Sequence, residues 1–241
     1  MPYIKRTTYA GKTIRIDKYY SSRYGKQVTR GERQEVTDEK QEERNRQNAI
    51  RRLNALLNCN FVDGDFHCTF TYQIKNRPGS VEEAKKNYSM LMRALGKAYR
   101  KEGKEFKYIA VTEYQSKSIH HHIVLPRIDV TVLQKCWPFP ERGKVLISPL
   151  NTDGEYYKLA EYLIKETDKT FKAGGMYGKR WNASKGLKQP VVVREIIEAK
   201  HFVNEPKPLK GYYIKKDVDF ELNSCDDYGI PKQSYIMVKI E

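Results

Sequence analysis

The central part of the chain, residues 61–166, alternates strand-like and helix-like runs in an order that few folds accommodate. A β-branched and aromatic run predicts a strand over 66–74. Apolar residues at steps of three and four predict a helix over 81–102, with Ser80 at capping-box spacing. Similar reasoning predicts strands at 107–114, 118–125 and 143–150, and helices at 129–137 and 156–166. The order strand–helix–strand–strand–helix–strand–helix indicates an α+β, ferredoxin-like domain with a central antiparallel sheet flanked by helices.

The two ends of the chain differ from this central part. Residues 1–60 carry 14 Lys+Arg against 7 Asp+Glu and predict an irregular basic arm over 1–35, followed by a helix over 38–57. The C-terminal part alternates basic loops, Gly and Pro with short apolar runs. We therefore expect a basic arm and helix at 1–60, a core at 61–170, and a basic extension at 171–241.

The charge balance favours a polyanionic partner. The chain has 45 Lys+Arg and 30 Asp+Glu, a net charge of +15, and neutralised phosphates supply most sequence-independent affinity for nucleic acid. An ordinary basic protein remains the alternative. No run approaches the roughly 20 apolar residues of a membrane span, and no secretory signal is visible at the start. We therefore expect no membrane contact. The four cysteines form no CxxC pair, so we expect no disulfide framework and a cytoplasmic location.

Three of the five histidines are adjacent, at positions 120–122. On a strand, His120 and His122 share a face and His121 points to the other. Glu113, near the end of the preceding predicted strand, can supply a third ligand if the two strands form a hairpin. Imidazoles with a carboxylate suit Mn²⁺ or Mg²⁺. An exposed cluster, satisfied buried histidines or a structural metal are the alternatives.

The last predicted helix presents a tyrosine on its polar arc. At about 100° per residue, Tyr162 falls opposite the apolar positions, together with Lys158, Lys165, Glu155 and Glu166. A tyrosine held by a rigid helix among polar groups suits a nucleophile, and Lys165, one turn away, can stabilise transition-state charge. The alternative is one exposed tyrosine among 18.

These motifs together resemble the HUH endonucleases, in particular the rolling-circle replication initiators of bacterial phages, plasmids and integrative elements. The segments that carry the likeness are FTY (70–72), VTEY (111–114), HHHIVL (120–125) and YLIK (162–165). The resemblance implies a metal-dependent reaction on single-stranded DNA at an origin, in the cytoplasm of a bacterial host. A tyrosine attacks a scissile phosphate, leaves a free 3′-OH and stays bonded to the 5′ phosphate, so the strand can be rejoined. By position, the implied roles are metal ligands His120, His122 and Glu113, nucleophile Tyr162, and assisting cation Lys165.

Two departures and one absence qualify the resemblance. The family usually has a bulky apolar residue where this chain has His121, and some relatives carry a second tyrosine four residues away. Here Lys158 and Glu166 occupy those positions, which indicates a single nucleophile. No GxxxxGK[ST] phosphate loop is present, so a host helicase is implied.

Basic residues interleaved with aromatics follow the tyrosine helix. Residues 165–188 hold 7 Lys+Arg against 2 acidic residues, a composition typical of single-strand binding, although a solvated loop is the alternative. The arm at 5–33 is a second candidate for contact with origin duplex. The residues that we expect to contact DNA are Lys158, Lys172, Lys179, Arg180, Trp181, Lys185 and Lys188.

Other functions fit parts of the pattern. A transposase or relaxase would use the same chemistry, but relaxases generally place the tyrosine ahead of the histidine motif, whereas Tyr162 follows it. A non-catalytic nucleic-acid-binding module can use the same kind of sheet, although binding does not require the joint occurrence of the site residues. A metal-dependent hydrolase using water would not need Tyr162.

Overall fold

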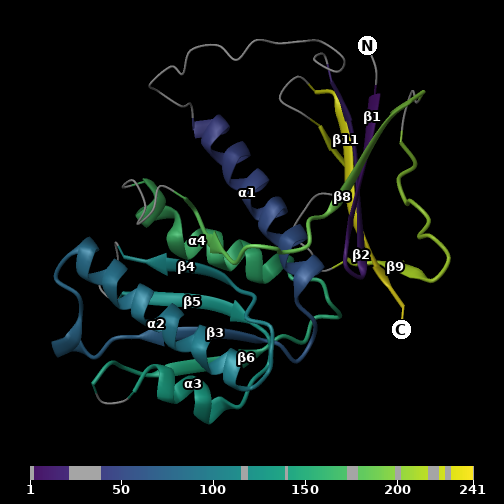
Figure 1. Cartoon of the computed structure of the whole chain (residues 1–241). Coiled ribbons are helices and arrows are strands. Elements are labelled where there is room, and N and C mark those ends of the chain that lie inside the picture. The colour runs from purple at the N-terminus through teal and green to yellow at the C-terminus, as the bar shows by residue number, and fades with distance from the viewer. Residues whose placement is uncertain are drawn as a thin grey trace. The chain divides into compact units, whose positions relative to one another are not determined.

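A computed structural model describes residues 3–21, 39–114, 119–138, 141–172, 179–198, 202–216, 223–225 and 229–240. Within these residues the chain is α+β, with two antiparallel sheets and four α-helices (Figure 1). The chain divides into two compact units. We call residues 60–152 with 159–187 the histidine unit, and residues 1–59, 153–158 and 188–241 the terminal unit.

The histidine unit is built on a five-stranded antiparallel sheet of order β6-β3-β5-β4-β7. Helix α2 joins β3 to β4, and helix α3 joins β5 to β6. The strands are β3 (Phe66–Thr71), β4 (Ile109–Glu113), β5 (His120–Leu125), β6 (Val145–Pro149) and β7 (Asn182–Ala183), and the helices are η1 (Ile74–Asn76), α2 (Val81–Lys101) and α3 (Val130–Cys136). The predicted strands and helices of this part are confirmed within a few residues at their ends. The predicted link between β4 and β5 at 115–117 lies outside the described residues.

Local capping and apolar periodicity explain why these helices form. Ser80 Oγ accepts the backbone N–H of Glu83 at 3.1 Å at the start of α2, as the capping-box spacing predicted. Asp129 accepts the N–H of Thr131 at 2.7 Å at the start of α3. The two helices cover one face of the sheet with a continuous apolar core (Figure 1). Its members include Cys68, Phe70, Leu91, Leu95, Tyr99, Ile123, Leu125, Leu133 and Trp137.

Helix α4 (Tyr157–Lys172) begins later than predicted. The sequence predicted Glu155 on the polar arc of this helix. Glu155 instead precedes the helix and is buried, and its carboxylate accepts hydrogen bonds from Asn54 Nδ2 at 2.8 Å and from the backbone N–H of Tyr157 at 3.0 Å. Asp153, two residues before Glu155, has a φ of 57°, in the left-handed region.

The terminal unit corrects the prediction of an irregular arm, because residues 3–20 form a β-hairpin. Residues 22–35 of the predicted arm lie outside the described residues. The hairpin turns at Gly11, whose φ is 58° and where an added Cβ would lie 1.9 Å from the carbonyl oxygen of Asn58. Glycine is therefore required at this turn.

The hairpin joins strands from the other end of the chain in a sheet of order β10-β11-β2-β1-β8, with β9 paired to β11. Its elements are β1 (Tyr3–Ala10), β2 (Thr13–Tyr20), β8 (Val191–Ile197), β9 (Tyr212–Ile214), β10 (Asn223–Cys225) and β11 (Pro231–Lys239), with helix α1 (Glu39–Asn60) in the same unit. The helix predicted over 38–57 is confirmed as α1. No helix among the described residues has both the length and the apolar composition that crossing a membrane requires.

Candidate active site

The face of the histidine-unit sheet opposite the core carries the predicted ligands. In the antiparallel register, Glu113 on β4 lies directly opposite His120 on β5, and Thr69 on β3 lies opposite His122. Residues paired in this way share a face of the sheet. The strand alternation that the sequence predicted therefore brings His120, His122 and Glu113 together.

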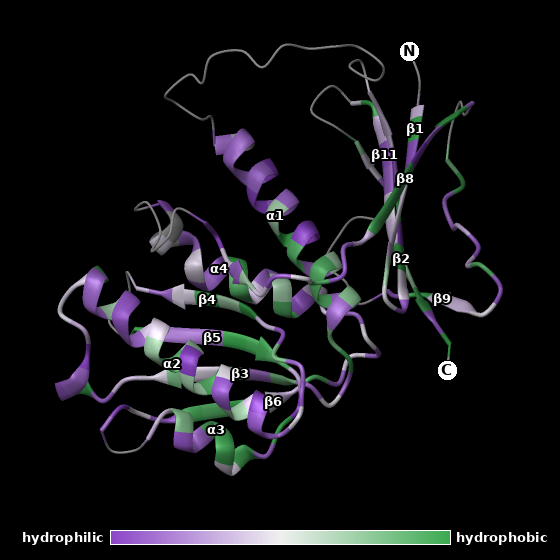
Figure 2. Cartoon of the chain, in the orientation of Figure 1, coloured by the Kyte–Doolittle hydropathy of each residue, from purple (hydrophilic) through white to green (hydrophobic). Residues whose placement is uncertain are grey.

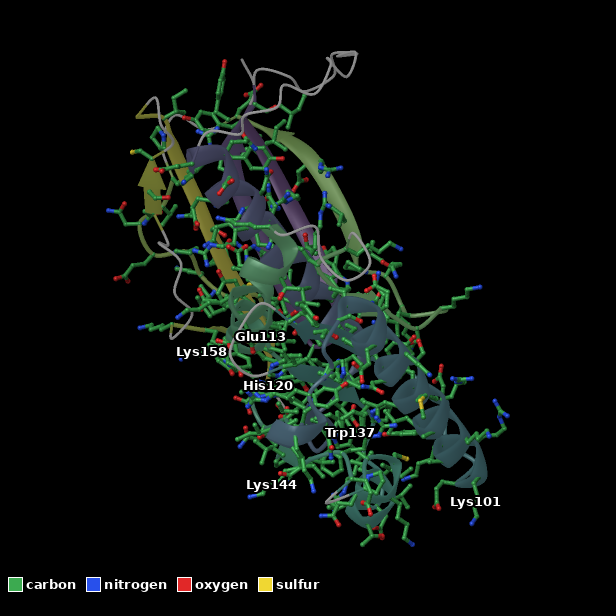
Figure 3. All side chains as sticks on the ribbon, turned by 90° about the vertical axis from the view of Figure 1, so that its left-hand side faces the viewer. Lys101, Glu113, His120, Trp137, Lys144 and Lys158 are labelled. Carbon is green, nitrogen blue, oxygen red and sulfur yellow. The ribbon has the colours of Figure 1, made fainter. Side chains whose placement is uncertain are left out.

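The three side chains form a group that can hold a metal ion. One ligand atom from each of Glu113, His120 and His122 lies within 4.8 Å of the others. Nδ1 of His120 is 3.4 Å from Oε2 of Glu113, and Figure 3 shows the two residues next to each other. Two imidazoles and a carboxylate are a donor set that divalent cations such as Mn²⁺ and Mg²⁺ accept.

His122 carries the feature that best fits a ligand. Its side chain is 2% exposed, its Nδ1 lies 3.2 Å from Oγ1 of Thr69, and its buried Nε2 has no hydrogen-bond partner among the described residues. Burial, and then the neighbouring histidines, lower the pKa of His122 to about 3, so the ring is neutral at physiological pH. When Nδ1 donates to Thr69, Nε2 keeps the lone pair that a metal ligand needs.

His121 points to the opposite face and has a different environment. It is completely buried, with the hydroxyl of Tyr72 2.7 Å from its Nε2 and Oγ1 of Thr112 2.9 Å from its Nδ1. Burial lowers the pKa of His121 to about 3. With both ring nitrogens satisfied inside the core, His121 offers no atom to the group of Glu113, His120 and His122.

Helix α4 brings Tyr162 to the face with the ligands. The Tyr162 ring lies edge-on to the ring of His122, with centroids 5.6 Å apart, and its side chain is 40% exposed. Burial, followed by the charges of Glu166 and Glu113, raises the pKa of the Tyr162 hydroxyl. Lys165 is exposed on the same helix, whereas Tyr157 is buried. The helix thus places one tyrosine both beside the ligand group and open to solvent.

His67 is a residue of this site that the sequence reasoning missed. Its ring stacks on His122 at a centroid distance of 5.5 Å and meets the edge of Tyr162 at 6.0 Å. Its Nε2 is buried without a hydrogen-bond partner among the described residues, and burial lowers its pKa to about 4. The alternation of β3 contains the signal, because His67 is two residues before Thr69 and so shares its face.

The residues predicted to contact DNA fall in both units. Lys158 and Lys188 belong to the terminal unit, and the others belong to the histidine unit. Arg180 and Lys172 both pair with Asp168, at 3.0 and 3.6 Å. Five of these predicted DNA-contacting side chains are exposed: Lys158, Lys172, Lys179, Lys185 and Lys188. Arg180 and Trp181 are partly buried. Residues 173–178 lie outside the described residues.

Comparison with protein-family models gives one match in the same region. Residues 65–171 match the model described as Replication-associated protein ORF2/G2P. This segment contains every predicted metal and catalytic position: Glu113, His120, His122, Tyr162 and Lys165. Comparisons with curated proteins and with solved structures find no match.

Proposed function

We propose that this protein initiates DNA replication by nicking single-stranded DNA at an origin through a tyrosine nucleophile, in the manner of the HUH endonucleases. The observation that carries the proposal is the position of Tyr162. Its ring lies against His122, a member of the group that can hold a metal, and the Nε2 of His122 has no hydrogen-bond partner among the described residues. All of these residues fall in the segment that matches a replication-associated family. A binding module would not need this combination.

The connectivity of the sheet supports the same proposal. Strands β3, β4, β5 and β6 follow the order strand–helix–strand–strand–helix–strand along the chain and β6-β3-β5-β4 across the sheet. This is the split β-α-β arrangement of a ferredoxin-like domain. It puts the ends of β4 and β5 next to each other at the sheet centre, where two histidines and a carboxylate can meet under α4.

The ligand group would hold a divalent cation through His120, His122 and Glu113. When bound, such a cation supplies Lewis-acid polarisation of a phosphate oxygen and withdraws charge as the phosphorus is attacked. Thr69 fixes the ring of His122 for this role, and His67 supports that ring by stacking.

In the proposed reaction, the Tyr162 oxygen forms a bond to the scissile phosphorus as the bond from phosphorus to the 3′ oxygen breaks. The phenolic proton is released to solvent, and the departing 3′ oxygen takes up a proton to become a free 3′-OH. Because the pKa of Tyr162 is raised, the hydroxyl is protonated at neutral pH and must lose its proton as it attacks. Lys165 offsets the negative charge that develops on the phosphate. The reverse sequence rejoins a strand without ATP, since the phosphotyrosine bond keeps the energy of the phosphodiester.

The proposed partners follow from this chemistry and from the charge of the chain. Single-stranded DNA is the substrate, origin DNA is the target, and a host helicase supplies unwinding. The exposed basic side chains that follow α4, together with Trp181, are proposed to hold the strand by phosphate contact and base stacking.

The test is a cleavage assay on labelled single-stranded DNA tiled across the gene's own neighbourhood, with Mn²⁺ or with EDTA, resolved on a denaturing gel. Wild type should give a metal-dependent band shifted by the mass of the protein, and Tyr162→Phe should give none. Tyr9→Phe is the matched control, because Tyr9 is 45% exposed and belongs to the terminal unit. Cleavage without a covalent adduct would indicate a hydrolase, and binding without cleavage on any tile would indicate a binding module.

A further inference from the structure

One face of the sheet in the terminal unit carries arginine and aspartate side chains. Directly paired residues of β8, β1, β2 and β11 form rows across the sheet and share a face. One row consists of Arg194, Arg6, Asp17 and Ser234, and the next of Val192, Thr8, Arg15 and Ile236. One apolar cluster lies on the other face, with Ile14, Ile16, Tyr235 and Met237. The face with the arginines also buries Ile4, Ala10, Ile236 and Val238, so its charged side chains lie next to buried apolar ones.

Helix α1 lines a cavity together with this face of the sheet. The cavity has a volume of about 340 Å³, and its lining contains five arginines and no acidic residue. The arginines are Arg6, Arg15, Arg51, Arg52 and Arg194, accompanied by Asn48, Asn54 and Asn58 of α1. An adjoining cavity of about 780 Å³ shares Arg6, Asn48 and Arg51 with the first and extends along α1. Together they form what we call the arginine groove, and Figure 2 shows that α1 is hydrophilic along much of its length.

The positive charge of the arginine groove is only partly balanced inside the protein. Asp17 pairs with Arg6 at 2.8 Å and with Arg15 at 3.0 Å. Burial alone would raise the pKa of Asp17, but the guanidinium groups of Arg15, Arg6 and Arg51 hold it well below its usual value. Burial, and then repulsion from Arg15, lower the pKa of Arg51. One buried and two partly buried arginines thus share the carboxylate of Asp17, an arrangement that an added anion would stabilise.

Arg51, which lines both cavities of the groove, has a nitrogen that can still donate a hydrogen bond. Its Nε is buried without a hydrogen-bond partner among the described residues. A guanidinium group presents its donors in a planar fork that matches two oxygens of a phosphate. Arg15 lies deeper in the same groove and is 8% exposed. The groove is therefore built to bind an anion with several oxygens.

We propose that the arginine groove binds the phosphodiester backbone of DNA, at a site separate from the histidine centre. Among the described residues, the lining of the first cavity contains no aromatic residue and Tyr19 is the one aromatic residue that lines the second, so most residues that line the groove have polar side chains. Arginine, asparagine and threonine side chains are instead those that contact phosphate and sugar, and the groove continues past the length of one cavity. The inference shares its DNA partner with the proposed function but requires neither a metal nor cleavage.

The experiment measures DNA binding in EDTA, where nicking does not interfere. Fluorescence anisotropy of labelled single-stranded and duplex oligonucleotides across a salt series gives the affinity and its salt dependence. The test variant is Arg51→Gln with Arg194→Gln. The control variant removes the same charge outside the groove, with Lys210→Gln and Lys239→Gln, whose side chains are exposed in the same unit. Melting curves of both variants establish that each is folded.

The groove variant should bind at least tenfold more weakly than the control variant. The slope of log affinity against log salt should fall by about 1.4 for single strands or about 1.8 for duplex, which corresponds to two lost phosphate contacts. Arg51→Lys with Arg194→Lys should recover much of the affinity. Equal affinity of the groove and control variants would overturn the proposal. Displacement of DNA by free deoxynucleotide or inorganic phosphate at matched phosphate concentration would overturn the choice of a strand as the occupant.

The outcome separates this inference from the proposed function. The two proposals have separate readouts, because DNA binding in EDTA does not require nicking. If the arginine dependence is found but no tile is ever cleaved, the proposed nicking fails and the arginine groove stands. If cleavage is found but the groove variant binds DNA as the control variant does, the arginine groove proposal fails and the proposed nicking stands.

Discussion

Thr69→Val should weaken metal binding without unfolding the protein. The hydroxyl of Thr69 lies 3.2 Å from Nδ1 of His122, which leaves Nε2 as the ring nitrogen without a hydrogen-bond partner among the described residues. Valine has a similar shape but leaves Nδ1 buried without its partner, so the ring is no longer held in the tautomer that presents the Nε2 lone pair. Loss of such a supporting contact typically costs 10–100-fold in metal affinity, or about 1.4–2.7 kcal/mol.

Two other threonines of the sheet give matched controls. Thr71 is on the same strand and face, but its hydroxyl donates to the carbonyl oxygen of Lys144 at 3.1 Å, so Thr71→Val should leave metal affinity unchanged. Thr112 lies 2.9 Å from Nδ1 of His121 in the core. Thr112→Val should therefore lower the free energy of unfolding by about 1–3 kcal/mol, again with little change in metal affinity.

Calorimetric titration with Mn²⁺ and denaturant unfolding in EDTA measure both quantities for the three variants. Of the three variants, only Thr69→Val should bind Mn²⁺ more weakly than the wild type by more than its change in the free energy of unfolding explains. It is refuted if Thr69→Val binds Mn²⁺ as tightly as the wild type, or if Thr71→Val loses as much affinity as Thr69→Val.

Three further predictions concern other residues. His67→Ala should slow cleavage roughly three- to tenfold, because the ring contacts to His122 and Tyr162 are worth about 0.5–1.5 kcal/mol. His67→Phe should restore most of the rate. An equal loss of rate in both variants would mean that the nitrogens of His67 take part directly. Lys165→Ala should reduce the single-turnover cleavage rate on the order of 10²-fold while anisotropy shows unchanged DNA binding, and a normal rate would remove Lys165 from the mechanism. The pKa of Asp17 is lowered in the folded state. Ionised Asp17 therefore stabilises the folded protein fully at pH values above its ordinary pKa of 3.8, and this stabilisation is lost as the pH falls toward the pKa of the folded state. Asp17→Asn should then cost about 3–5 kcal/mol in urea unfolding at pH 7 and clearly less at pH 3, whereas an equal cost at both would contradict the assignment.

The parts of the fold that local chemistry determines were predictable from the sequence. Helix α2 has a capping residue at Ser80 and an apolar repeat that needs no distant partner to be recognised. The period of two residues along a strand was enough to separate His120 and His122 from His121, and the structure places His121 in the core. The group of His120, His122 and Glu113 required only one further assumption, the antiparallel pairing of β4 with β5.

The terminal unit could not be predicted, because its strands pair across almost the whole chain. Arg15 on β2 donates to Ser234 on β11, 219 residues away. The arginines and Asp17 on the inward side of the hairpin also break the apolar alternation by which a strand is usually recognised. The sequence predicted an irregular basic arm here, whereas residues 3–20 form two strands of a sheet.

Two errors at the site have a similar origin. The sequence did not mark His67 as a site residue. The alternation of β3 puts His67 on the face of Thr69, but the pairing of β3 with β5 and the packing of α4 bring His122 and Tyr162 beside it. Glu155 was assigned to a solvent-facing arc, but Asn54 and the start of α4 bury its carboxylate. Contacts between segments distant in sequence decided both positions, and helical or strand periodicity does not report them.

The most direct test of the central claim is to identify the residue that becomes joined to DNA. After reaction with Mn²⁺ and single-stranded DNA, the adduct is trimmed with nuclease, digested with trypsin and analysed by mass spectrometry. Cleavage after Lys158 and Lys165 releases the peptide LAEYLIK, whose single tyrosine is Tyr162, while Tyr156 and Tyr157 fall in a different peptide. The account predicts a nucleotide 5′-phosphate on residues 159–165 alone. A nucleotide on any other peptide, or cleaved DNA with no modified peptide, would contradict it.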